Sequence, residues 1–171
     1  MKYLLSMILL FSLVAYGQTA KEYLKKGTEY TKTGEYQSAI DDLTECLRID
    51  TNYALAYNMR GFAYRNLGNY EEAIADYTRA IRIDPDRIDD DIADAKYWRG
   101  EAYYNLGNYE KAIADFTEFI RLAPDIADTY YNRGLAKLKL GQKESGCLDL
   151  SKARELGFAD ANDEITKYCQ K

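Results

Sequence analysis

A four-fold internal repeat is the feature that most constrains how this chain can fold. Residues 54–87 contain two runs of helical periodicity separated by Gly68 and Asn69, and three further copies of this segment lie along the chain. The four copies span residues 20–53, 54–87, 93–126 and 127–160, so successive copies begin 34, 39 and 34 residues apart. Because a hairpin of two short helices cannot bury both of its apolar faces alone, neighbouring copies must stack on one another.

Each copy keeps a glycine inside its first helix, at Gly27, Gly61, Gly100 and Gly134. Glycine inside a helix costs about 1 kcal/mol relative to alanine, so its repetition at one position indicates a close approach by the second helix. The second helix offers a small residue and then a large one. The small residues are Ala39, Ala73, Ala112 and Gly146, and the large ones are Leu43, Tyr77, Phe116 and Leu150.

In period and in this small and large pattern, the segments resemble the tetratricopeptide repeat family. The resemblance is most complete in the second and third copies, where Pro85 and Pro124 end the pattern. It implies an all-α fold, a right-handed αα-superhelix (solenoid) of four helical hairpins, and a protein that binds other proteins or peptides. Residues 161–169 lie where a next repeat would begin and predict a helix that caps the last hairpin.

The first 17 residues have a different character. Lys2 is followed by an apolar run over residues 3–16, which is shorter than the about 20 residues that a membrane span needs. Small residues precede Gln18, as at a signal-peptidase site. We therefore expect residues 1–17 to be a signal peptide, the protein to be exported (periplasmic or secreted), and residues 18–171 to form a single domain with no membrane span. An uncleaved membrane anchor is the alternative.

Composition argues against several classes of function. The chain has no histidine, its three cysteines lack metal or redox spacing, and no phosphate-binding glycine loop is present. We therefore expect no catalytic residues, no cofactor and no metal site. The aspartate-rich residues 84–94 do not match the calcium-loop template and predict a solvated loop. A formal net charge of −5 without a basic stripe argues against a nucleic-acid partner.

The family resemblance also implies where a ligand would bind. First helices line the concave surface in this family, and here their lining positions combine aromatic rings, amides and an arginine. Such a surface suits an extended peptide or protein segment. The candidate residues are Asn58, Phe62, Arg65, Asn66, Tyr97, Glu101, Tyr104, Asn105 and Tyr131, and the fourth copy adds Leu135, Leu138 and Lys139.

Two alternatives to this interpretation stay open. Tyr97 and Tyr131 can instead pack between neighbouring helices. The protein can also be a structural subunit of an envelope assembly, with its contacts outside the groove.

Opposite charges recur at two further repeat positions. The first helix carries Lys26, Arg60, Arg99 and Arg133, and the second carries Asp42, Asp76, Asp115 and Asp149. Because the two positions lie at similar heights on facing helices, we expect an ion pair within each hairpin, weaker for the lysine. The alternative is eight independently solvated charges.

The cysteines carry one more prediction. Cys147 takes the position of Ile40, Ile74 and Ile113, which is expected to face the following helix. For Cys147 the following helix is the cap, and Cys169 lies at its end, so the sequence predicts a Cys147–Cys169 disulfide in an oxidising compartment. Buried, reduced cysteines are the alternative. Cys46 stands where the second and fourth copies have Ala80 and Ala153, and it is expected to be a small buried thiol.

Overall fold

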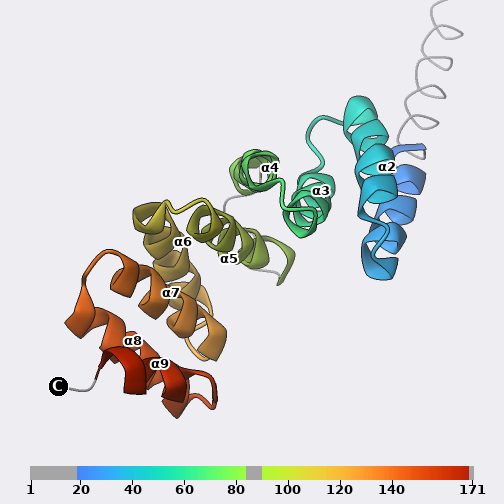
Figure 1. Cartoon of the computed structure of the whole chain (residues 1–171). Helices are drawn as coiled ribbons and strands as arrows, with labels where there is room; N and C mark the ends of the chain where they lie inside the picture. Colours follow the sequence, from blue (N-terminus) through green and yellow to red (C-terminus); the bar gives the residue numbers. More distant parts are fainter. Residues whose placement is uncertain (1–18, 84–89, 170–171) are drawn as a thin grey trace, which may run out of the picture. The chain divides into compact units, whose positions relative to one another are not determined.

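The computed structural model describes residues 19–83 and 90–169, and all regular secondary structure in these ranges is helical (Figure 1). The predicted all-α fold is thus confirmed. The expected signal segment and most of the aspartate-rich loop lie outside these ranges. A helix over residues 19–33 precedes α2 (Tyr36–Ile49), α3 (Ala54–Asn66), α4 (Tyr70–Ile83), α5 (Asp90–Asn105), α6 (Tyr109–Leu122), α7 (Ala127–Lys139), α8 (Lys143–Glu155) and α9 (Ala161–Tyr168).

A tight glycine turn joins the two helices of a hairpin. Gly68 adopts a φ of +81°, a conformation that a residue with a Cβ rarely enters. Its N–H donates to the carbonyl of Arg65 at 3.0 Å, and the N–H of Asn69 donates to that of Tyr64 at 2.9 Å. These bonds satisfy the last carbonyls of α3 and allow α4 to begin at Tyr70.

The chain divides into two compact units, Met1–Pro85 and Asp86–Lys171. In the first unit, α2 packs on α3 and α3 on α4. In the second unit, α5 packs on α6, α6 on α7, α7 on α8 and α8 on α9. The expectation that residues 18–171 form a single domain stays a prediction.

The core of each hairpin forms where the helix glycine meets the large residue. A Cβ added at Gly61 would lie 3.0 Å from Cε1 of Tyr77 and 3.3 Å from the Ala73 carbonyl oxygen. The Tyr77 ring is fully buried, as is Phe116 at the same position of the α5–α6 hairpin. The repeated glycines therefore mark the close helix approach that the sequence predicts.

Three of the four expected ion pairs are present. Arg60 donates to Asp76 through Nε at 2.7 Å and Nη2 at 2.8 Å, and the Arg99–Asp115 and Arg133–Asp149 pairs repeat this fork. A third nitrogen of Arg60, Nη1, donates to Thr44 of α2 at 3.0 Å. Each of these arginines thus links the two helices of its hairpin, and Arg60 also ties the hairpin to the preceding helix.

The fourth pair does not form. Both members are among the described residues, yet no ion pair joins Lys26 to Asp42 there, and the Lys26 ammonium lies 5.9 Å from the centroid of the Tyr23 ring. A lysine is a single flexible donor that cannot bind both carboxylate oxygens in the way a guanidinium does. Because Lys26 is exposed, water solvates its charge without the aspartate.

Candidate functional site

Three of the four candidate residues on α3 are at least partly exposed, and the fourth is buried. The Phe62 ring meets the Tyr36 ring edge-on, with centroids 6.3 Å apart, and the Arg65 guanidinium lies 5.1 Å from the Phe62 centroid. Asn66 is exposed, and its amide donates to the Phe62 carbonyl at 2.8 Å. Asn58, by contrast, is only 2% exposed, so it belongs to the interior of the first unit.

Tyr97 on α5 packs between helices. Its ring centroid lies 5.8 Å from that of Phe116 and 5.4 Å from that of Phe119, both on α6. Its hydroxyl accepts a hydrogen bond from Asn132 of α7 at 2.9 Å. Of the two interpretations that the sequence left open for Tyr97, the packing role is the one the structure describes.

The other candidates on α5 lie near its carboxyl end. Tyr104 is half-buried, and its ring meets Tyr109 at a centroid distance of 5.3 Å. Burial, and then the negative potential of neighbours such as Glu164, raise the pKa of the Tyr104 phenol, which stays protonated and able to donate at neutral pH. Asn105 is exposed, and its amide donates to the carbonyl of the half-buried Glu101 at 2.9 Å.

Tyr131 on α7 lies against the connection between α8 and α9. Its ring is 4.6 Å from that of Phe158, centroid to centroid, at an interplanar angle of 38°. Burial and the neighbouring carboxylates of Glu164 and Asp160 raise the pKa of its phenol. Tyr131 is half-buried, so it supports the surface between α7 and α9 and keeps part of its ring open to solvent.

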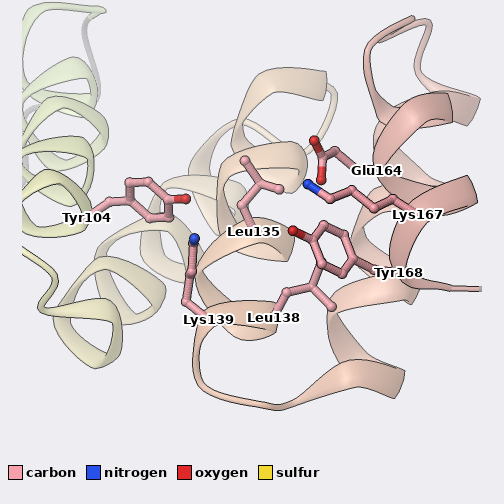
Figure 2. A pocket seen from close by; sticks show the side chains of 7 residues that line it. All are labelled: Tyr104, Leu135, Leu138, Lys139, Glu164, Lys167 and Tyr168. Carbon is pink, nitrogen blue, oxygen red and sulfur yellow. The ribbon is translucent and has the colours of Figure 1, made fainter.

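A pocket of about 210 Å³ lies between α5, α7 and α9, all within the second unit. Leu135 and Leu138 of α7 lie between Tyr104 on one side and the side chains of α9 on the other (Figure 2). The lining residues are Tyr104, Leu135, Leu138, Lys139, Glu164, Lys167 and Tyr168. Tyr104 is thus the candidate that the structure places at a pocket, beside three residues of the fourth repeat that the sequence also indicated.

Three pocket residues come from the cap helix and were not predicted. Counted from the first alanine of each repeat, Lys167 takes the place of Arg133 and Tyr168 the place of Gly134, positions that face the second helix in a complete hairpin. In α9 these side chains face the pocket instead. The repeat period predicts that α9 follows α7 in the stack, but it does not predict that Lys167 and Tyr168 face the pocket.

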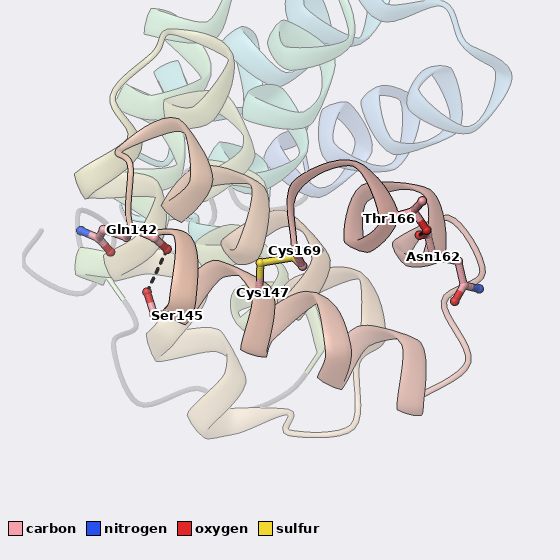
Figure 3. Close-up of a disulfide and its surroundings, with 6 residues drawn as sticks. All are labelled: Gln142, Ser145, Cys147, Asn162, Thr166 and Cys169. Carbon is pink, nitrogen blue, oxygen red and sulfur yellow. Dashed lines mark hydrogen bonds between the residues drawn. A yellow bond between two sulfur atoms is a disulfide. The ribbon is translucent and has the colours of Figure 1, made fainter. Parts of the chain in front are cut away.

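A disulfide between Cys147 of α8 and Cys169 ties the end of the cap to the last hairpin (Figure 3). Cys169 takes the repeat position of Leu135, which lines the pocket. The sulfur of Cys169 is bonded to α8, and Cys169 is not among the residues that line the pocket. Lys167 and Tyr168, two residues and one residue before Cys169, line the pocket with Leu135 and Leu138 of α7.

The chemistry of this surface favours binding. Among residues 19–83 and 90–169, no group of three or more His, Cys, Asp or Glu side chains could hold a metal ion. None of the helices in these ranges is long and apolar enough to cross a membrane. Two tyrosines, two leucines, two lysines and a glutamate line the pocket, and such groups recognise a ligand by contact and hydrogen bonding.

Stacked hairpins with a pocket between their first helices define a helical-repeat protein of the solenoid class. Family models described as tetratricopeptide repeat match residues 20–53 and 54–87, and a family model described as TPR repeat matches residues 100–141. The chain belongs to the tetratricopeptide repeat family.

Solved structures of the same fold cover most of the chain. MamA 41-end from Desulfovibrio magneticus RS-1 is 23% identical over 88% of this chain and 93% of its own, with a TM-score of 0.75. YrrB, a TPR protein with an unusual peptide-binding site, is 22% identical over 96% and 88%, with a TM-score of 0.77. The first TPR of Spaghetti (RPAP3), bound to the HSP90 peptide SRMEEVD, is 25% identical over 72% and 94%, with a TM-score of 0.67. No curated protein matches the chain.

Proposed function

We propose that this protein is an exported, non-catalytic interaction module that binds an extended segment of another protein along its first helices. The observation that carries the proposal is the pocket of the second unit, which Tyr104 lines and beside which the exposed Asn105 follows on α5. Aromatic rings can hold side chains there, and amides beside them can bind a peptide backbone.

Two relatives support a peptide ligand. RPAP3 holds an HSP90 peptide on the same fold, and YrrB has a peptide-binding site. Leu24 and Thr28 occupy the positions where chaperone-binding members of the family carry lysine and asparagine, so a different ligand is expected here. A disordered ligand loses conformational freedom on binding a surface of this modest size, so we expect an affinity on the order of micromolar.

Export is supported by the sequence of residues 1–17 and by the disulfide of the second unit, since disulfides persist in oxidising compartments. The intact mass of the protein purified from its native cell tests this part. A mature chain that begins at Gln18 is the expected result. A chain that retains residues 1–17 would contradict cleavage and favour the membrane anchor.

Site-specific crosslinking tests the binding surface. A photoreactive amino acid placed at Asn105, and in a matched control at Glu71 on α4, is irradiated in the native cell, and crosslinked proteins are identified by mass spectrometry. Affinity is then measured with purified partner. The double variant Tyr104→Ala and Asn105→Ala should bind at least about tenfold more weakly, with helicity and melting temperature nearly unchanged.

The matched control replaces exposed Glu71 and half-buried Arg79 on α4 by alanine and should leave binding intact. Undiminished binding by the Tyr104 and Asn105 variant, together with loss in the α4 variant, would place the contact on the second helices. A stable complex of that kind is what a structural subunit of an envelope assembly would give.

A further inference from the structure

We propose that the pocket between α5, α7 and α9 selects the ligand: it takes one large apolar side chain of the bound segment, and Lys139 at its rim pairs with an acidic side chain next to it. This inference rests on the proposed function and names the ligand chemistry of the same surface. The occupant is therefore an internal stretch of a partner protein with adjacent apolar and acidic residues.

The size of the pocket limits its occupant. Its volume of about 210 Å³ is below the about 300 Å³ at which sites for whole small molecules begin. It is large enough for a leucine, methionine or phenylalanine side chain. The pocket is therefore a subsite for one residue of a longer ligand.

The lining determines which residue that is. Leu135 and Leu138 give the pocket an apolar base, and the rings of Tyr104 and Tyr168 stand on opposite sides of it (Figure 2). At the leucines and the ring faces, a polar group would lose its hydration without regaining hydrogen bonds, since the charged groups of the lining belong to other side chains. An apolar side chain instead removes the leucines and rings from water.

The charge at the rim determines the neighbouring residue. The Lys167 ammonium lies 4.6 Å from the centroid of the Tyr168 ring, and Glu164 of the same helix lines the pocket beside it. Lys139 is exposed and makes no ion pair with any described residue. The chain as a whole has a net charge of −5, so it is the local positive charge of this exposed lysine beside the pocket that favours an acidic ligand group at that point.

A single accessible ammonium suits a single carboxylate from a side chain. A chain-terminal carboxylate would need several convergent donors to offset its desolvation, and here Lys167 is already engaged by Tyr168 and Glu164. The pocket is also bounded by α5, α7 and α9, and an extended segment that leaves it can continue over the neighbouring first helices α7 and α5. An internal residue pair therefore fits better than a chain end.

NMR titration of the isotope-labelled full chain tests the pocket directly. The probe is a blocked hexapeptide with a central Leu-Glu pair, added up to about 10 mM, so that even millimolar affinity is detected. Three matched probes replace the pair by Ala-Glu, by Leu-Lys, or by a leucine that carries the free terminal carboxylate. Shifts concentrated at Leu135, Leu138 and Tyr168, with at least fivefold tighter binding of Leu-Glu than of each other probe, are the expected result.

Reversing the charge of Lys139 tests whether this lysine selects the acidic residue of the ligand. Lys139→Glu should weaken the Leu-Glu probe at least fivefold and make Leu-Lys the tighter of the two. Lys143→Glu changes the net charge equally at an exposed position of α8 outside the pocket, and should change neither affinity by more than twofold. Because both lysines are exposed, neither variant should disturb folding.

The proposal is overturned by the absence of localised shifts, by equal effects of the two lysine variants, or by tighter binding of the terminal-carboxylate probe. Any of these results leaves the proposed function intact if partner capture still depends on Asn105. Failure of the proposed function shows separately, as partner capture that the Tyr104 and Asn105 variant retains.

Discussion

Arg99 and Asp115 face each other across the α5–α6 hairpin, with two hydrogen bonds of 2.7 Å between guanidinium and carboxylate. Their side chains are 18% and 11% exposed, so the pair is mostly withdrawn from water. Because the planar guanidinium matches both carboxylate oxygens at once, the pair fixes the height at which the two helices meet.

The first prediction is that Asp115→Ala lowers the free energy of unfolding by about 3 kcal/mol, because it leaves the Arg99 guanidinium largely buried without its main partner. Urea denaturation measures the change. Asp42→Ala is the matched control, since Asp42 has no ion pair with Lys26, and should cost less than about 1 kcal/mol. Equal costs in the two variants would show that the fork contributes nothing beyond a surface charge.

The internal repeat made the ion pairs and the close helix approach predictable from the sequence. Arginine at one position and aspartate at another recur together, so the pairing could be read from the chain itself, as could the close approach at Gly61. The sequence also placed Cys147 against the cap, where the structure has the disulfide. Each of these predictions rests on equivalent positions in several copies. A residue type that recurs at one repeat position indicates a structural requirement, which a residue in a single copy does not.

The second prediction concerns that close approach. Gly61→Ala should destabilise the protein by about 1–3 kcal/mol, although alanine favours a helix, because the new Cβ would lie 3.0 Å from the Tyr77 ring and 3.3 Å from a backbone oxygen. Thermal unfolding followed by circular dichroism measures it. As a control for helix propensity alone, Ala75→Gly at an exposed position of α4 should cost about 1 kcal/mol. A more stable Gly61→Ala protein would contradict the tight contact.

The candidate site was less predictable than the fold. Lining positions taken from regular repeats do not tell which side chains the local packing buries, and Asn58 and Tyr97 lie in that packing. The cap helix has no second helix among the described residues, and it is held by its packing on α8 and by the disulfide at Cys169. Lys167 and Tyr168 consequently line the pocket although their repeat positions do not predict it.

The third prediction uses the buried thiol of Cys46. Burial, and then the charge of Asp50, raise the pKa of this thiol from 9.0 to about 11. The unfolded chain therefore releases the proton first, and the stabilising contribution is full below pH 9 and is lost as the pH rises from 9 to 11. The wild type should lose stability more steeply over this range than Cys46→Ala, which places at residue 46 the alanine found at Ala80 and Ala153.

Denaturation at several pH values measures both slopes. Tyrosines remote from residue 46 cancel in the comparison, whereas the pKa of Tyr53, which burial raises and Cys46 raises further, changes with the substitution and adds to the difference. A thiol reagent at pH 8 provides an independent check. The native oxidised protein should not react, and the unfolded protein should react at one site per chain, since Cys46 is the free cysteine of the described residues. Parallel slopes or rapid native reaction would contradict a protected thiol.

The fourth prediction concerns Thr129, which is fully buried in α7 and whose hydroxyl has no hydrogen-bond partner among the described residues. The same repeat position holds Ala56 and Ala95. Thr129→Ala should therefore change stability by less than about 0.5 kcal/mol or raise it, because it removes a buried polar group without breaking a bond. Thr129→Ser keeps the hydroxyl and should be the less stable variant in urea denaturation. The reverse order would show that the hydroxyl is satisfied.

The last prediction separates the disulfide from the rest of the second unit. Helix α9 has eight residues and packs on α8, and the Cys147–Cys169 bond closes a loop with a sequence separation of 22. Changing both cysteines to serine should lower the free energy of unfolding by about 3 kcal/mol in the chain-entropy account. Hydrogen exchange should quicken in α9 while α5 to α8 keep their protection, because their hairpin contacts do not involve this bond. Reducing agent should have the same effect on the wild type and none on the double variant. Exchange that quickens equally in all five helices would show that the bond supports the whole unit and does not act on the cap alone.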